Sequence, residues 1–361
     1  MYIKNLELIN FRNYERLSLN LHSGINVFVG DNAQGKTNIL ESIYYCSIGK
    51  SHRTNKDKEL IKWGARDAYI SIYVSKERLD KKIDIKIFKE GKKGVRVNSI
   101  KLKTISDLIG VFNVVMFSPE DLKIIKESPS YRRKFLDIEL SKLNKKYYHS
   151  LVIYNKVLNE RNTILRKWNS NKEVTEVYDY QLSKYGSYII KERLKYIESL
   201  SLRGNKIHKD ITSQKENIEF KYITSIKDLN NIQNDFYNIL RENIKKDFEK
   251  GSTSFGPHRD DFAVNINATD TRTYGSQGQQ RTAVLTIKLA SLEIIKEQTG
   301  EYPVLLLDDV LSELDINRQK YILNSIREFQ TIITGTGLID IREYLDDHVK
   351  LFKVTNGTIN E

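Results

Sequence analysis

The sequence predicts an α/β protein whose head, built on mixed and antiparallel sheet, is interrupted by a mainly helical second lobe. Apolar and polar residues alternate in the first 120 residues and again after residue 256, as they do in half-buried strands. Between residues 130 and 250 the apolar residues recur every three or four positions, which is typical of helices. We therefore place the head at residues 1–125 and 251–361 and the inserted lobe at residues 126–250.

The head begins with strands and tight turns. Leu6 and Leu8, then Leu17 and Leu19, keep a period of two, and residues 25–29 form an apolar run typical of a buried strand. Antiparallel strands follow over residues 69–103. Their polar side is rich in lysine, which fits a solvated sheet edge as well as contact with DNA.

The lobe shows three helical patterns, with a polar break at residues 169–171 and an end near Gly251. Their apolar faces carry Tyr147, Leu151, Tyr154 and Leu158, then Tyr178, Leu182, Tyr185 and Ile189, and finally Phe236, Leu240, Ile244 and Phe248. No proline lies between residues 130 and 256 to interrupt them. Tyrosines at this spacing fit a helical core better than base stacking.

Strands return in the last third of the chain. Residues 262–266 alternate, and residues 304–307 and 331–334 form apolar runs separated by a helical segment. Because such runs are typical of strands covered on both faces, they belong to the centre of the head.

Composition limits the class of protein. The net charge is +12, with the basic excess in the first 250 residues, which suits a polyanionic partner or a general lysine bias. The single cysteine, Cys46, excludes an internal disulfide and a thiolate zinc site. No apolar stretch approaches the roughly 20 residues that span a bilayer, and the first ten residues resemble a strand, so we expect a cytoplasmic protein without a membrane partner.

Residues 30–37 match the phosphate-binding loop pattern GxxxxGK[ST] at every fixed position. The loop consists of Gly30, Asp31, Asn32, Ala33, Gln34, Gly35, Lys36 and Thr37. Lys36 would reach the β- and γ-phosphates in a catalytic role, and Thr37 would offer its hydroxyl to Mg²⁺. The strand before and the helix after complete the pattern, so ATP and Mg²⁺ are the expected cofactors.

A second acidic element follows the apolar run at residues 304–307. Asp308 would hold Mg²⁺ through water, and Asp309 would stand where a catalytic base polarises the attacking water.

Two further segments resemble those of ABC-type ATPases. Residues 276–281 resemble the signature motif, in which a serine hydroxyl and a glycine amide, here Ser276 and Gly278, meet the γ-phosphate. Residues 312–315 resemble the D-loop. A helix N-cap is the alternative role for Ser276. In that class the signature of one protomer completes the ATP site of another, so the resemblance implies an ATP-dependent homodimer.

The whole chain resembles the RecF family of bacterial recombination mediators, related to SMC-like ATPases. The resemblance is carried by residues 8–14, 30–37, 49–54, 117–122, 132–133, 255–261 and 307–315. It implies slow ATP hydrolysis, binding to double-stranded and single-stranded DNA at gaps and junctions, and partnership with RecR, together with RecO. It further implies recombinase loading at gaps in repair, replication restart and the SOS response, and it places Arg12 and Asn13 near the phosphates.

The chain also departs from the ABC pattern. Asp309 stands where glutamate is usual, residues 334–336 replace the switch histidine, and Glu120 and Asp121 lie nearest the expected metal-contacting glutamine. These departures favour feeble hydrolysis, and a clamp that binds ATP without hydrolysing it is the alternative. His258, beside two acids but without a second ligand at fixed spacing, fits a hydrogen-bonded turn better than a metal site.

Overall fold

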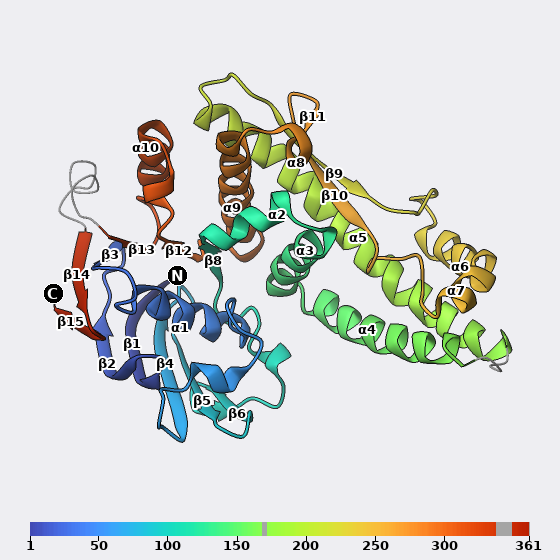
Figure 1. The fold of residues 1–361 in the computed structure, drawn as a ribbon. Coiled ribbons are helices and arrows are strands. Elements are labelled where there is room, and N and C mark those ends of the chain that lie inside the picture. Colours follow the sequence, from blue (N-terminus) through green and yellow to red (C-terminus); the bar gives the residue numbers. More distant parts are fainter. Residues whose placement is uncertain (168–171, 337–348, 361) are drawn as a thin grey trace. The chain divides into compact units, whose positions relative to one another are not determined.

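The computed structural model describes residues 1–167, 172–336 and 349–360 (Figure 1). The polar break expected at residues 169–171 lies outside them. The contacts divide the chain into two compact units. We call Met1–Asp121 with Lys288–Glu361 the head unit and Leu122–Ile287 the helical unit.

The head unit contains a six-stranded, largely parallel sheet in the order β15-β14-β3-β13-β12-β8. Its strands are β3 (Ile25–Val29), β8 (Val114–Phe117), β12 (Val304–Asp308), β13 (Thr331–Gly335), β14 (Val349–Thr355) and β15 (Thr358–Asn360). Only the edge strand β15 runs antiparallel to its neighbour. Because the carboxyl ends of β3, β12 and β13 point the same way, the loops that follow them meet at one edge of the sheet.

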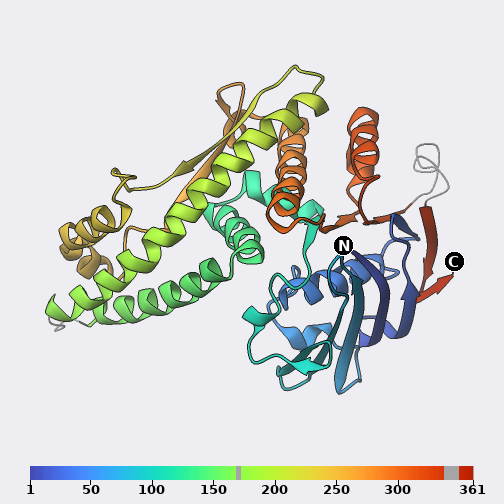
Figure 2. The same cartoon turned by 180° about the vertical axis from the view of Figure 1, so that it is seen from behind.

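The second sheet of the head unit is antiparallel, in the order β2-β1-β4-β5-β6-β7 (blue to teal in Figure 2). Its strands are β1 (Tyr2–Phe11), β2 (Tyr14–Asn20), β4 (Asp67–Ser75), β5 (Lys81–Phe88), β6 (Lys93–Val97) and β7 (Ile100–Lys101). The short helices of this unit are η1 (Asp57–Leu60), η2 (Ile105–Asp107) and η4 (Leu311–Glu313), and α10 (Ile316–Ser325) follows η4. The mixed α/β class predicted from the sequence is confirmed.

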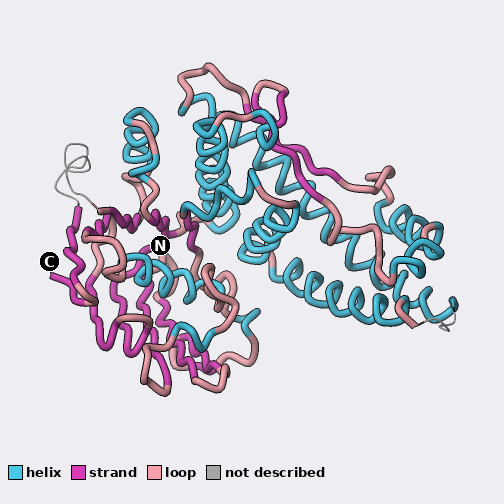
Figure 3. The backbone as a smooth tube through the Cα atoms, viewed as in Figure 1, coloured by secondary structure: helices cyan, strands magenta, loops and turns pink. Residues whose placement is uncertain are grey.

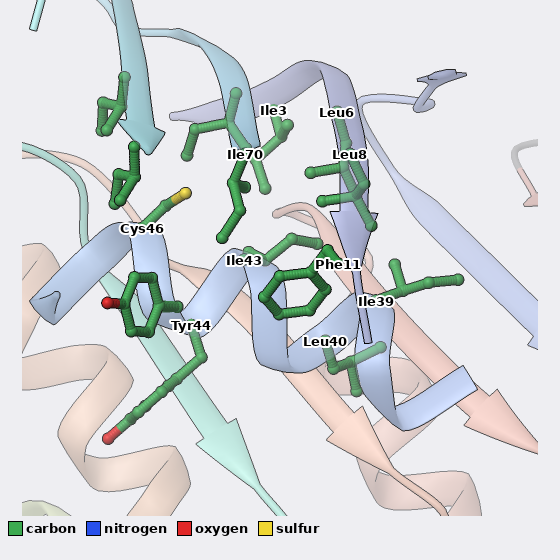
Figure 4. Packing of buried hydrophobic residues seen from close by; sticks show 14 of the residues in the cluster. Ile3, Leu6, Leu8, Phe11, Ile39, Leu40, Ile43, Tyr44, Cys46 and Ile70 are labelled. Carbon is green, nitrogen blue, oxygen red and sulfur yellow. The ribbon is translucent and has the colours of Figure 1, made fainter. Parts of the chain in front are cut away.

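Helix α1 (Lys36–Ile48) joins both sheets into one apolar core. Its buried Ile39 and Ile43 face Leu6 and Leu8 of β1 (Figure 4). The same cluster includes Phe28 of β3. Each buried side chain of this size contributes roughly 1.5–3 kcal/mol relative to exposure. The core therefore holds the start of α1 rigidly beside the end of β3.

The helical unit is dominated by long helices (Figure 3). The helices of this unit, long and short, are α2 (Lys123–Lys126), α3 (Pro129–Leu143), α4 (Lys145–Leu165), α5 (Lys172–Ile211), α6 (Ile232–Glu242), α7 (Ile244–Lys250), α8 (Thr271–Tyr274) and the first part of α9 (Gln277–Thr299). The short 3-10 helix η3 (Pro119–Leu122) leads into this unit. The single helix expected across residues 236–248 is in fact two. Asn243 divides it because its side chain donates to the Ile239 carbonyl at 2.8 Å and competes with the helical bonds.

The boundary of the helical unit differs from the one predicted at residue 251. Strand β9 (Ile218–Ile223) pairs antiparallel with β10 (Asp261–Ile266), which pairs with β11 (Thr269–Asp270). Residues 251–287 consequently pack with the helices rather than with the head. The alternation at residues 262–266 correctly indicated a strand. A period of two shows that one face of the strand is buried, but it does not show which strand pairs with it.

A buried ionic cluster joins three helices of this unit. The Arg161 guanidinium on α4 is fully buried and donates to Asp179 on α5 at 2.6 Å and to Asp247 on α7 at 2.7 Å. Thr253 accepts a further bond at 2.8 Å. Separating one partner from such a cluster would leave an uncompensated buried charge. The cluster therefore fixes the mutual placement of α4, α5 and α7.

His258 lies in a hydrogen-bonded turn, as the sequence predicted. Its Nε2 lies 3.1 Å from the Thr253 carbonyl, which can only accept, so Nε2 carries the proton. Its Nδ1 then accepts from the Tyr154 hydroxyl at 2.7 Å. No cluster of three potential metal-binding His, Cys, Asp or Glu side chains occurs within the described residues.

We expect the His258 ring to stay neutral at pH 5. Burial lowers the pKa of His258 to about 4, so its contribution to stability is complete above pH 6.5 and is lost as the pH falls through 4. Burial also raises the pKa of neighbouring Asp260 to about 6, and that contribution has the opposite sign in this window. Global unfolding therefore mixes the two effects. NMR titration of the imidazole, whose signals are assigned with His258→Gln, follows the protonation of His258 alone. A titration midpoint near pH 6.5 would contradict the structure.

In the part of the chain that the structure describes, no helix combines the length and the apolar character that crossing a bilayer requires.

Candidate functional site

The loop after β3 is the segment that the sequence predicts to surround phosphates, and Gly35 determines its conformation. Gly35 has a φ of 114°, and a Cβ at this position would lie 2.5 Å from the side-chain nitrogen Nδ2 of Asn13 and 2.8 Å from the Tyr14 hydroxyl. Glycine is therefore required both by the backbone conformation and by the space. The Tyr14 hydroxyl donates to the Gly35 carbonyl at 3.1 Å, which fixes the loop where α1 begins. The first turn of α1 then offers backbone amides to an anion.

Lys36 folds back over this loop. Its Nζ donates to the carbonyls of Gly30 at 2.5 Å and Asp31 at 2.8 Å, and the residue is 7% exposed. Burial lowers the pKa of Lys36, while the charges of Asp309 and Asp308 act in the opposite direction. An ammonium group held above the loop by two carbonyls is placed to exchange them for phosphate oxygens.

Thr37 and Asp308 meet although 271 residues separate them. The Thr37 hydroxyl donates to Asp308 Oδ1 at 2.9 Å, and the Thr334 hydroxyl donates to the same oxygen at 2.9 Å. These groups are hard oxygen donors, and magnesium bound with a nucleotide takes few protein ligands beside phosphate and water. The residues therefore fit Mg²⁺, which Thr37 and Asp308 would hold.

Asp309 adopts a left-handed backbone conformation with a φ of 54°. Its amide donates to the Thr334 carbonyl at 3.2 Å and hydroxyl at 3.1 Å, which anchors β12 to β13 beyond their last paired residues. Aspartate and asparagine tolerate this conformation better than glutamate does. The backbone thus gives a physical reason for aspartate at a position where the ABC-type pattern that the sequence resembles has glutamate.

Arg12 and Asn13, predicted near the phosphates, occupy different places. Asn13 donates to the Gln34 carbonyl in the loop at 3.0 Å. Arg12 instead binds fully buried Glu41 through Nε at 2.8 Å and Nη2 at 2.7 Å, and its Nη1 donates to the Glu59 carbonyl at 2.9 Å. The guanidinium of Arg12 thus donates its hydrogen bonds to Glu41 and to the Glu59 carbonyl. A contact between Arg12 and the nucleotide stays a prediction.

Glu41 organises the segments around the loop. Burial opposes its ionisation, but hydrogen bonds from Arg12 and Ser51 outweigh burial and hold the pKa of Glu41 below its usual value. The Ser51 hydroxyl donates at 2.5 Å, and Arg53 lies 3.6 Å away. The carboxylate thereby joins the turn between β1 and β2, α1 and residues 51–53 around the start of the site.

The turn between β14 and β15 also contacts the phosphate loop. The Asn356 amide donates to Gln34 Oε1 at 2.5 Å, and the Gly357 amide donates to the Gln34 carbonyl at 3.3 Å. The sequence indicated neither this contact nor those of Glu41, and it singled out residues 334–336 only as the segment in place of the switch histidine, without the contact between Thr334 and Asp308. None belongs to a contiguous motif, and the nearest signal was the polar turn residues at 356–357.

The signature-like segment lies in the helical unit. Ser276 is exposed, and its hydroxyl accepts from the Gln279 amide at 3.2 Å while Gln279 Oε1 accepts from the Ser276 amide at 2.9 Å. This reciprocal pair is a capping box at the start of α9. Gly278 lies in the first turn, with its carbonyl accepting from the Thr282 hydroxyl at 2.8 Å. The N-cap alternative therefore describes Ser276 within one chain, and it leaves the hydroxyl at the surface.

Asp121, one of the residues nearest the expected metal-contacting glutamine, is bound by protein groups. Its Oδ1 lies 2.7 Å from Lys288 Nζ, and its Oδ2 accepts from the Ser118 amide at 2.8 Å. In the D-loop-like segment, Asp315 caps α10 by accepting from the Arg318 amide at 3.0 Å, and the Ser312 hydroxyl donates to the Asp309 carbonyl at 2.9 Å.

Known proteins resemble this chain over its whole length. The model of the RecF/RecN/SMC N-terminal domain matches residues 2–360. DNA replication and repair protein RecF of Clostridium novyi is 95% identical over 361 residues, with 100% of both chains covered. The RecF protein of Clostridium botulinum is 64% identical, with 99% of both chains covered.

A solved structure of the recombination mediator RecF with ATP, described as part of the RecFOR pathway, has a TM-score of 0.92 and 41% identity. The alignment covers 99% of this chain and 97% of that one. An Smc head bound to the C-terminal winged-helix domain of ScpA shares the fold, with a TM-score of 0.59 and 17% identity over 100% of this chain and 96% of that chain. Family model, sequence and fold thus agree, and the chain belongs to the RecF family, within the RecF/RecN/SMC group.

Proposed function

We propose that this protein is an ATP-dependent recombination mediator that dimerises on ATP, binds gapped and junction DNA, and helps to load recombinase at single-strand gaps. The observation that carries the nucleotide part is the meeting of Thr37 and Asp308 beside Lys36 on the loop after β3. A hydroxyl, a carboxylate and an ammonium group at one sheet edge are the groups that ATP and Mg²⁺ require. The RecF structure with ATP supports the same assignment.

Association would follow from a divided nucleotide site. In the proposed dimer Ser276 and Gly278 of one protomer contact the γ-phosphate held by Lys36 of the other. Exposure of Ser276 at the start of α9 supports this role, because a surface hydroxyl on a rigid capped helix is available to a second chain. ATP then favours the dimer because only the dimer surrounds the γ-phosphate.

Hydrolysis would release the dimer slowly. Asp309 is the proposed base, and its side chain is one methylene shorter than the usual glutamate, so it holds water less closely. Bound Mg²⁺ would neutralise the charge that develops on the phosphates. Lys36 would orient the γ-phosphate, while Thr37 and Asp308 hold the metal. Slow turnover suits a switch that stays on DNA rather than a motor.

The cellular role and the protein partners are proposed from the similar proteins. The solved mediator is described within the RecFOR pathway, and the curated relatives are named DNA replication and repair proteins. We extend to this chain a cytoplasmic role in repair, replication restart and the SOS response, with RecR and RecO as partners. The net charge of +12 supports contact with DNA phosphates.

Retention on gapped duplex tests the proposal. With ATP the full-length protein is expected to stay on the DNA longer than with ADP or without nucleotide, and affinity should fall steeply as salt rises, because each phosphate contact releases counterions. Lys36→Ala is the control, since it removes the phosphate contact and should abolish the ATP effect. Equal retention under all three nucleotide conditions would contradict the proposal. Phosphate release measured in parallel separates a slow ATPase from a clamp that never hydrolyses.

A further inference from the structure

Trp63 lies at the tip of a turn with 99% of its surface exposed. Burying an indole is favourable because it removes a large apolar area from water, and Trp63 contributes none of this to the fold. The Ala65 amide donates to the Lys62 carbonyl at 3.0 Å, which closes a tight turn with Trp63 at its second position. Gly64 supplies the positive φ of 87° that such a turn requires at its third position.

The turn is exposed, but its base is fixed. A Cβ on Gly64 would meet nothing within 4 Å, so the tip stands in open space. The Lys62 amide donates to the Asn10 carbonyl at 2.8 Å, and buried Ile61 forms a bridge with Phe11 of β1. The indole is thereby presented to solvent on an ordered backbone, which lowers the entropy cost of binding through it.

Basic side chains surround this turn in the chain and across the sheet. The Lys89 amide donates to the Arg66 carbonyl at 3.1 Å, so the end of the β5–β6 hairpin lies beside the turn. The exposed or half-exposed basic residues of the two segments are Lys56, Lys58, Lys62, Arg66, Lys86, Lys89 and Lys92. Glu15, Glu59 and Asp67 pair with Lys62, Lys56 and Lys86 respectively. Asp57 and the exposed Glu90 also lie in residues 56–67 and 86–92, so the seven basic residues outnumber the four acidic ones of these two ranges and their net charge is positive.

A second aromatic ring lies at the same end of the sheet. Phe88 is 37% exposed and stands opposite Asp67 in the register of β5 and β4. Lys86 Nζ lies 5.3 Å from its ring centroid, a cation–π arrangement. Aromatic rings among cations on one surface are the combination that holds single-stranded nucleic acid, where bases stack on the rings and phosphates meet the cations.

We propose that Trp63 is a base-stacking site for single-stranded DNA, with Arg66 and Lys89 contacting the flanking phosphates. The proposal deepens the function proposed above by assigning one of its DNA contacts. A protein partner would also cover an exposed indole, but the surrounding positive charge favours a polyanion. Stacking tolerates any base, so this site would hold the unpaired strand of a gap without reading its sequence.

Fluorescence of the indole provides the test. The chain has two tryptophans, so the full-length Trp168→Phe protein reports on Trp63 alone. Titration with oligo(dT) is expected to quench this emission in parallel with binding measured independently by the anisotropy of a label on the DNA. Trp63→Ala should weaken oligo(dT) binding roughly 5- to 150-fold, the range for losing one stacked base. Trp63→Phe, which keeps a ring, should lose less.

Tyr73→Ala is the matched control, because Tyr73 is a partly exposed aromatic residue near the opposite end of β4, and this variant should bind normally. Emission that does not change while oligo(dT) binds would overturn the stacking site and leave the proposed function standing. Unchanged DNA affinity in Trp63→Ala, with weakened self-association or RecR binding, would overturn it in favour of a protein contact. No binding of wild type to any DNA would overturn the proposed function as well.

Discussion

Ser276→Arg is expected to abolish ATP-dependent dimerisation while ATP binding by each monomer stays near the wild-type value. The hydroxyl of Ser276 is exposed at the start of α9, and in the proposed dimer it meets the γ-phosphate at hydrogen-bond distance. Arginine cannot enter the space of a hydroxyl beside a bound phosphate, so the partner chain is held away. The loop after β3 lies in the other unit of the chain and is not altered.

Sedimentation velocity with and without ATP measures the effect, and we expect the dimerisation constant to weaken roughly 100-fold or more, as for blocking a central interface contact. Loss of the N-cap alone costs about 1 kcal/mol, which is too little to unfold the protein. Ser276→Thr is the matched control because it keeps both hydroxyl and cap, and it should dimerise. An undiminished dimer of Ser276→Arg would rule out the shared site.

Asp309→Asn is expected to lower ATP turnover roughly 10²- to 10⁴-fold and to accumulate the ATP-bound dimer on DNA. Asparagine fits the left-handed backbone at this position as well as aspartate does, so the bonds from its amide to Thr334 should persist. The substitution removes the ability to accept a proton from water, together with the negative charge that Asp309 places near Lys36. The nucleotide would therefore still join the two chains but would not be consumed.

Phosphate release and DNA dissociation should be measured on the same preparation of Asp309→Asn. Slower release of both is the expected pattern, since dissociation waits for hydrolysis. Turnover of Asp309→Asn at the wild-type rate would show that another group activates the water.

The strand, loop and helix at residues 25–48 and the acid at the end of β12 were predictable as structural elements because each is contiguous in sequence, and their contacts with phosphate and Mg²⁺ stay predictions. A strand, a glycine-containing loop and a helix follow one another at residues 25–48, and the chemistry of phosphate binding fixes their residue types. The apolar run before Asp308 likewise predicts a buried strand that ends in an acidic residue. Periodicity and local motif were sufficient for both.

The supporting contacts were not predictable in this way. Glu41 binds Arg12 across 29 positions, and Thr334 reaches Asp308 across 26. Gln34 is held by the Asn356 amide, 322 residues away. Periodicity shows that a residue is buried but not which distant group it meets. Residues 251–287 were assigned to the head for the same reason. The pairing of β10 with β9 places these residues in the helical unit, and the sequence pattern does not show that pairing.

The proposed mechanism requires that the nucleotide joins two copies of the chain, and sedimentation velocity of the wild-type protein tests this requirement most directly. Saturation with a non-hydrolysable ATP analogue and Mg²⁺, in the presence of gapped duplex, is expected to convert the monomer to a dimer, while ADP leaves it monomeric. A chain that stays monomeric with the analogue would contradict the shared site, whatever its affinity for ATP or for DNA.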